Sequence, residues 1–106
     1  MRRPADFRSA MRRGRRTGTE TVVVYLALTG DAHSMAGFAV SRTVGGAVIR
    51  NRVTRRLRAI LVELLPTLPA GAHVVVRALP AAASASFDTL RNDVGEALSR
   101  SLSKAR

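Results

Sequence analysis

The chain has no cysteine among its 106 residues. It therefore has no disulfide framework, no cysteine-ligated zinc or iron–sulfur site and no thiol nucleophile. No apolar run approaches the roughly 20 residues that a membrane-spanning helix needs. Pro4, Asp6 and Arg8 interrupt the N-terminal region, where a secretory signal would need a continuous apolar stretch. These absences predict a cytoplasmic protein without a membrane partner.

Acidic residues are scarce where basic residues are dense. The chain has 17 Arg and 1 Lys against 7 acidic residues, and 18 − 7 gives the net charge of +11. Residues 2–16 contain seven arginines and one aspartate, and residues 42–58 contain six arginines and no acid. Such a density of one charge is usually matched by an external anion. Because the arginine fork fits phosphate and stacks on bases, the pattern favours a nucleic-acid partner.

The length and the 46% of hydrophobic residues predict one domain, residues 1–106, with its own core. We expect a helix from near Pro4 to Gly14, a basic connector at 15–19, strands at 21–28, 35–41 and 72–79, a long helix between Gly46 and Pro66, and a last helix capped by Ser86 or Ser84. The second strand would lie antiparallel to the first if their connection is a hairpin. The order α-β-β-α-β-α predicts an α+β two-layer sandwich with a small mixed sheet and about three helices.

The long helix separates apolar residues from arginines. On a helical wheel one stripe about 120° wide contains the apolar residues Ile49, Val53, Leu57, Ile60, Leu61 and Leu64. The far side carries Asn51, Arg52, Arg55, Arg56 and Arg58, with Arg50 at the edge of the stripe. A solvated helix face normally pairs arginine with glutamate four residues away, and within this helix no acid occurs before Glu63. The face is therefore interpreted as an anion-binding surface. We expect the double substitution R52A and R56A to weaken nucleic-acid binding while the fold stays intact.

The last helix has its own apolar pattern, and the chain offers little for catalysis. Phe87, Leu90, Val94, Ala97, Leu98 and Leu102 are expected to form the apolar face of that helix. His33 and His73 have no partners at metal-ligand spacing. The sequence has no glycine-rich phosphate loop and no nucleophile–base pair, so we expect no catalytic residue in this chain.

Residues 44–58, VGGAVIRNRVTRRLR, resemble the signature of the bacterial ribonuclease P protein family. ADFRSAMRRGRR (5–16), VVVYLAL (22–28), GFAVSRTVG (37–45) and HVVVRALPAA (73–82) resemble other parts of the family in the same order. The chain departs from the family pattern at Met11, Thr43, Gly46 and Thr54, where the family commonly has Phe, a basic residue, Asn and Lys.

The resemblance implies an accessory subunit of a ribonucleoprotein endoribonuclease whose active site is in its RNA. Such proteins help the catalytic RNA to remove the 5′ leader from precursor tRNA, and their fold has a left-handed βαβ crossover. Residues that would contact the catalytic RNA are Arg42, Arg50, Asn51, Arg52, Arg55, Arg56 and Arg58. Residues that would line the leader cleft are Phe7, Arg8, Met11, Arg12, Tyr25 and Ser41. Mg²⁺ is expected to be held mainly by RNA and phosphates, without dedicated protein ligands, and no obligate protein partner is expected. A structural RNA-binding protein, such as a ribosomal component, remains the alternative.

Overall fold

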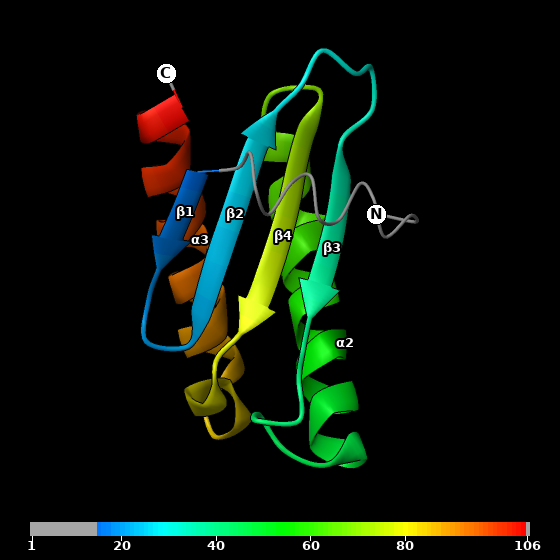
Figure 1. Cartoon of the computed structure of the whole chain (residues 1–106), viewed down its shortest axis with the longest axis vertical. Helices are drawn as coiled ribbons and strands as arrows, with labels where there is room; N and C mark the ends of the chain where they lie inside the picture. The colour runs from blue at the N-terminus through cyan, green and yellow to red at the C-terminus, as the bar shows by residue number, and fades with distance from the viewer. Residues whose placement is uncertain (1–14, 106) are drawn as a thin grey trace.

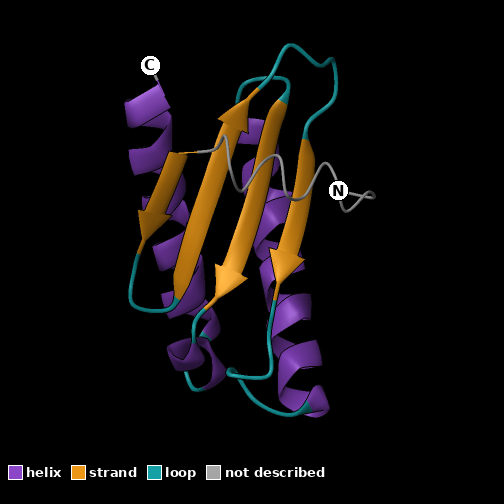
Figure 2. Cartoon of the chain, viewed as in Figure 1, coloured by secondary structure: helices purple, strands orange, loops and turns teal. Residues whose placement is uncertain are grey.

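The computed structural model describes residues 15–105. Its regular elements are the strands β1 (Arg15–Gly18), β2 (Val22–Leu28), β3 (Met35–Ala39) and β4 (Ala72–Ala78), the helices α2 (Ala47–Leu64) and α3 (Phe87–Ala105), and the short 3₁₀ helices η1 (Leu65–Thr67) and η2 (Pro80–Ala83). One four-stranded sheet forms the first layer, and α2 and α3 lie side by side behind it as the second (Figures 1 and 2). The predicted α+β two-layer sandwich is confirmed.

The strand order is β1-β2-β4-β3, so β4 lies in the middle of the sheet although it comes last in sequence. β2 pairs antiparallel with both β1 and β4, with Val24 opposite Val76. β3 pairs in parallel with β4, with Phe38 opposite Val76. Because residues opposite each other across strands share a face, the row through Thr17, Val24, Val76 and Phe38 lies on the helix side of the sheet.

The core fills the space between the sheet and the two helices. α2 contributes its predicted apolar stripe, with Val53, Leu57 and Ile60 fully buried. α3 contributes Leu90, Val94 and Ala97, which are also fully buried. A buried hydrogen bond of 2.7 Å between the hydroxyls of Thr17 and Ser101 joins β1 to α3. Both helices are therefore fixed in rotation, because each must turn its apolar stripe toward the sheet.

The connection β3–α2–β4 is a crossover between neighbouring parallel strands. In Figure 1 both strands run downward, β3 lies to the right of β4, and α2 passes behind the sheet. This arrangement is a left-handed crossover, as the family resemblance implies, and it is the opposite of the hand that most such units adopt.

Three expectations from the sequence are wrong. The connector expected at 15–19 is in fact the edge strand β1, because residues 15–18 find pairing partners in β2. β3 runs antiparallel to β2, but the hairpin that would pair the two strands does not form, because β4 lies between them. Phe87 is 38% exposed instead of buried, since it is the first residue of α3 at the end of the sandwich.

The last helix begins where the sequence suggests. The Ser86 hydroxyl accepts a hydrogen bond from the backbone N–H of Thr89 at 3.1 Å, which is the geometry of a helix cap. The helix expected between Pro4 and Gly14 lies outside the described residues.

Candidate nucleic-acid interface

The arginine-rich face belongs to α2 and follows from the way this helix starts and packs. Gly45 and Gly46 separate it from the preceding turn, and Gly46 takes the N-cap position with extended backbone and no side-chain cap. The first turn contains no acidic residue. Since Val53 and Leu57 must face the sheet, Asn51, Arg55 and Arg58 are turned to solvent, and all three are exposed.

These three exposed side chains share one hollow on the outer face of α2. Val48, Asn51, Thr54, Arg55 and Arg58 line it, and its volume is about 510 Å³. Within residues 15–105 the ion pairs are His73–Asp31, Arg91–Glu63 and Arg100–Glu96. None of them involves an arginine of α2, so in this part of the chain the positive charge of the hollow is not neutralised by a carboxylate.

Arg52 and Arg56 behave differently from Arg55 and Arg58. Arg52 donates from Nη2 to the carbonyl oxygen of Ala83 at 2.9 Å, and Arg56 donates from Nη1 to that of Ala85 at 3.1 Å. Both arginines are half-buried, because they lie on the side of α2 that faces η2 and the start of α3. They therefore tie the segment before α3 to α2. The expectation that R52A with R56A leaves the fold intact must be revised accordingly, since both carbonyls would lose a charged donor.

Each of these guanidinium groups still has N–H groups to spare. An arginine has five N–H donors, and in each of these two residues one described hydrogen bond ends on a carbonyl. The Nε atoms of Arg52 and Arg50 are buried, so the donors that Arg52 can offer to an external acceptor are those of its terminal nitrogens. Arg52 and Arg56 are thus held in place while keeping donors for a further acceptor.

Arg42 and Arg50 lie at the N-terminal end of this face. Arg42 is exposed in the turn before α2, where its carbonyl oxygen accepts a hydrogen bond from the Gly45 N–H at 3.2 Å. Arg50 is half-buried, and its carbonyl oxygen accepts from the Thr54 hydroxyl at 2.8 Å. The first turn of α2 begins between Arg42 and Arg50 in the chain. Its free N–H groups attract anions, as the two arginines do.

The residues expected around the leader are placed only in part. Tyr25 is 7% exposed and belongs to a small apolar cluster with Val23 and Val75, on the sheet face opposite the two helices. Ser41 is exposed beyond the end of β3, with its hydroxyl 2.7 Å from that of Thr43. Phe7, Arg8, Met11 and Arg12 lie outside the described residues.

Two arginines on this second face were missed by the sequence reasoning. Arg16 is the partner of Tyr25 across β1 and β2, and Arg77 is the partner of Val23 across β4 and β2. Both arginines are exposed. Alternation along residues 72–79 could have assigned Arg77 to one face of its strand, but only the register shows that this is the face of Tyr25.

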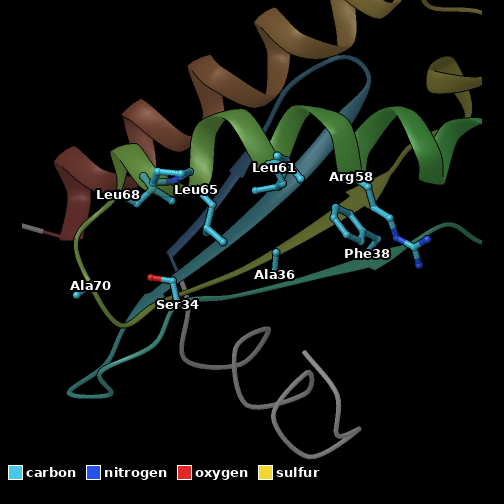
Figure 3. Close-up of a pocket in the computed structure, with 10 residues that line it drawn as sticks. Ser34, Ala36, Phe38, Arg58, Leu61, Leu65, Leu68 and Ala70 are labelled. Atoms are coloured by element: carbon cyan, nitrogen blue, oxygen red, sulfur yellow. The ribbon is translucent and has the colours of Figure 1, made fainter.

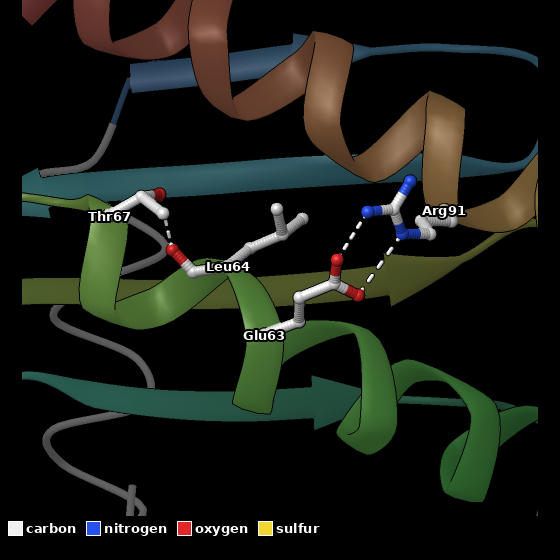
Figure 4. Close-up of polar contacts among 4 residues, drawn as sticks. All are labelled: Glu63, Leu64, Thr67 and Arg91. Atoms are coloured by element: carbon white, nitrogen blue, oxygen red, sulfur yellow. Dashed lines mark hydrogen bonds and ion pairs between the residues drawn. The ribbon is translucent and has the colours of Figure 1, made fainter.

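Across the seam between the helices, Arg91 of α3 binds Glu63 of α2 through two hydrogen bonds (Figure 4). The Nε of Arg91 lies 3.1 Å from Oε2 of Glu63. These hydrogen bonds hold the pKa of Glu63 below its ordinary value and raise the pKa of Arg91. Glu63, the first acid after the arginine run, is therefore engaged on the α3 side and does not neutralise the exposed arginines.

The part of the chain that the structure describes contains neither a cluster of metal ligands nor a membrane-spanning helix. Among them no three His, Asp or Glu side chains gather in a group that could hold a metal ion. His33 is exposed, and His73 places Nε2 3.1 Å from Oδ2 of Asp31. Neither helix in residues 15–105 is long and apolar enough to cross a bilayer.

Comparison with known proteins identifies a family model and several relatives that match this chain. Residues 1–102 match the family model described as Ribonuclease P. Proteins named "Ribonuclease P protein component" are similar to this chain. The one from Acidothermus cellulolyticus is 49% identical over 102 residues, which cover 94% of this chain and 85% of the relative. The one from Nocardioides sp. is 50% identical over 103 residues, which cover 94% and 88%.

Solved structures agree in fold. The RNase P protein from Thermotoga maritima superposes with a TM-score of 0.82 at 27% identity, covering 94% of each chain. The RNase P protein from Staphylococcus aureus gives a TM-score of 0.81 at 23% identity, covering 93% of this chain and 91% of that one, and shows likeness of fold. These matches do not favour the alternative of a structural protein such as a ribosomal component.

Proposed function

This chain belongs to the ribonuclease P protein family, the accessory subunit of a ribonucleoprotein endoribonuclease that processes tRNA, and from that premise we propose which of its surfaces meet which RNA. The outer face of α2 binds the catalytic RNA. The opposite face of the sheet, around Tyr25, binds the 5′ leader of precursor tRNA. The observation that carries the first assignment is the exposed hollow around Asn51, Arg55 and Arg58, whose charge no described carboxylate neutralises.

On the α2 side, the binding is electrostatic. Arg55 and Arg58 contact phosphates from an exposed helix face, and Arg42 adds a cation before the first turn. Arg52 and Arg56 use the donors that their hydrogen bonds to Ala83 and Ala85 leave over, and Arg50 adds a half-buried cation. Asn51 offers both a donor and an acceptor at the same hollow. Because contacts to phosphate position an RNA without reading its bases, this surface selects the catalytic RNA by shape and phosphate spacing.

On the sheet side, Arg16 and Arg77 supply cations next to the apolar cluster of Tyr25. An extended single strand suits such a surface, because charged side chains can follow its backbone while its bases pack on apolar groups. Phe7, Arg8, Met11, Arg12 and Ser41 complete this proposed leader site on the strength of the family resemblance.

Catalysis is assigned to the RNA, and so is Mg²⁺. Mg²⁺ prefers phosphate oxygens and water to a protein cage, and the described residues gather no carboxylate group that suits it. The role of this chain is therefore to neutralise phosphates and orient the leader, and no proton transfer is assigned to its side chains. A cytoplasmic location follows from this proposal, because both RNA partners would be met there.

The salt dependence of RNA affinity tests the α2 assignment. We expect Arg55→Ala to weaken binding of a ribonuclease P catalytic RNA and to reduce the slope of log affinity against log salt by about one. Arg100→Ala is the matched control, since it removes one exposed arginine from a helix outside the proposed interface. Equal slopes for the two variants would contradict the assignment.

Cleavage of a precursor tRNA tests the whole proposal. Wild-type protein added to the catalytic RNA at low Mg²⁺ should increase removal of the leader, and Arg55→Ala should require more protein for the same gain. An identical protein requirement for wild type and Arg55→Ala would refute the role of this surface.

A further inference from the structure

An apolar groove lies beside the arginine surface, between β3 and the C-terminal half of α2. Its volume is about 520 Å³. The lining is mostly hydrocarbon: Ala36, Phe38, Leu61, Val62, Leu65 and Leu68, with further contributions from Ser34, Arg58, Pro66 and Ala70. Figure 3 shows Ala36 and Phe38 on the strand side, and Leu61 and Leu65 on the helix side, of the space between strand and helix. Val62, on the helix, is 77% exposed.

Arg58 connects this groove to the polar hollow on α2. It lines both the hollow that contains Asn51 and Arg55 and the groove that contains Phe38. In Figure 3 the Phe38 ring lies next to the Arg58 side chain, whose guanidinium points away from the groove. A phosphate held by Arg55 and Arg58 would therefore lie one arginine side chain away from an apolar space with an aromatic wall.

We propose that the groove receives an unpaired base of the RNA whose phosphates bind at Arg55 and Arg58. This inference rests on the proposed function of α2. Unpaired bases in RNA are commonly recognised by stacking on aromatic and apolar side chains. The groove supplies Phe38 of β3, Leu61 of α2 and Leu65 of η1 for the base faces, while its open mouth leaves the polar base edge in contact with water. Ser34 offers a hydroxyl at the other end.

The positive charge of this surface favours a nucleotide over two other occupants of the groove, a second copy of the chain and an apolar peptide. A second copy of the chain would bring another net charge of +11 to the same place, and such self-repulsion opposes association. An apolar peptide would gain nothing from the neighbouring Arg55 and Arg58. A nucleotide matches both the arginine-lined hollow and the apolar groove, because it joins an anionic phosphate to a flat ring that can stack on apolar side chains.

A titration with adenosine 5′-monophosphate, monitored by NMR, tests whether one nucleotide places its phosphate in the hollow and its base in the groove. We expect the nucleotide to shift the methyl signals of Leu61, Leu65 and Leu68 by ring currents. Inorganic phosphate should shift the Arg55 and Arg58 signals and leave those methyls unchanged. Methyl signals that stay in place at millimolar nucleotide would overturn the proposal.

Variants of Phe38 test the inference with the catalytic RNA itself. Phe38→Leu keeps an apolar side chain but removes the ring, and we expect RNA affinity to fall about fivefold to a hundredfold, the range for one stacked base. The slope of affinity against salt should remain that of wild type. Phe38→Trp restores a stacking surface and should recover most of the lost affinity. Thermal melting of both variants establishes that each is folded at the assay temperature.

The two proposals fail in distinguishable ways. If Arg55→Ala lowers the salt slope while Phe38→Leu leaves affinity unchanged, the α2 assignment stands and the base-binding groove is wrong. If Phe38→Leu loses affinity and Phe38→Trp does not recover it, stacking is excluded and the groove proposal also falls. A photoreactive residue at Val62 should cross-link to RNA, and a cross-link to a second copy of the chain would overturn the proposal.

Discussion

Arg56 of α2 donates a hydrogen bond from Nη1 to the carbonyl oxygen of Ala85, 3.1 Å away, on the approach to α3. One turn earlier, Arg52 makes the same kind of contact with Ala83. Two of the seven residues that the family resemblance assigns to the catalytic RNA therefore also support the fold.

The first prediction separates these two roles. Arg56→Ala should lower the free energy of unfolding by about 1–2 kcal/mol, because a half-buried carbonyl loses a charged donor. Arg55→Ala should stay within about 0.5 kcal/mol of wild type, since its side chain is exposed and makes no described ion pair. Urea denaturation measures both values. Equal stability of the two variants would mean that the contact between Arg56 and Ala85 contributes nothing to the fold.

The second prediction concerns Arg77, on the sheet face opposite the helices. Arg77→Ala should weaken binding of a precursor tRNA on the order of fivefold at low salt, because one charged contact to the leader backbone is lost. Affinity for a mature tRNA without a leader should not change. Fluorescence anisotropy with the two RNAs measures the difference, and Arg100→Ala serves as the charge-matched control. A loss that is equal for both tRNAs would place Arg77 outside the leader site.

The third prediction concerns the start of α2. A Cβ atom at Gly46 would meet no heavy atom within 4 Å, and the backbone there is extended. Gly46→Asn should therefore raise the free energy of unfolding by about 0.3 kcal/mol, because the Asn side chain can cap the helix. Gly45→Ala should lower it, because Gly45 has φ +155° and its Cβ would lie 3.0 Å from Cγ2 of Ile49. Thermal melts that rank the two variants in the opposite order would refute this account of the helix start.

The fourth prediction follows from the pKa of Glu63. The hydrogen bonds from Arg91 lower that pKa in the folded protein. A lowered folded pKa contributes stability above the unfolded value, and the contribution is lost as the pH falls through the folded value. The stability advantage of wild type over Glu63→Gln should thus be constant near neutral pH and disappear well below the ordinary glutamate pKa of 4.5. Because both side chains are exposed, the advantage is small. Urea titrations at pH 7 and pH 3 measure it, and an advantage that grows on acidification would contradict the sign.

Local patterns in the sequence were sufficient for several elements. The apolar stripe of α2 predicted which residues are buried, because a helix can cover a sheet with only one face. Ser86 predicted the start of α3, since its hydroxyl can satisfy a free N–H of the first turn. The same reasoning failed at Phe87, because helical spacing does not say where the covering sheet ends.

Pairing between distant segments could not be predicted in the same way. Residues 15–18 look like a connector, and they form a strand only because β2 offers a free edge. The place of β4 between β2 and β3 is likewise a matter of long-range pairing. Such contacts depend on how the whole chain collapses, and no local pattern records them.

By itself, the sequence determined that α2 is amphipathic, that its polar side is arginine without acid, and that the chain resembles one family from end to end. These are properties of residue spacing and charge, which do not depend on what lies nearby. The tertiary structure decided how those arginines divide. Arg52 and Arg56 lie over the seam with α3 and donate to carbonyls there, whereas Arg55 and Arg58 remain open to solvent. It also decided that Arg58 adjoins an apolar groove and that Arg77 shares a face with Tyr25, because both relationships join segments that meet only when the sheet and helices have packed.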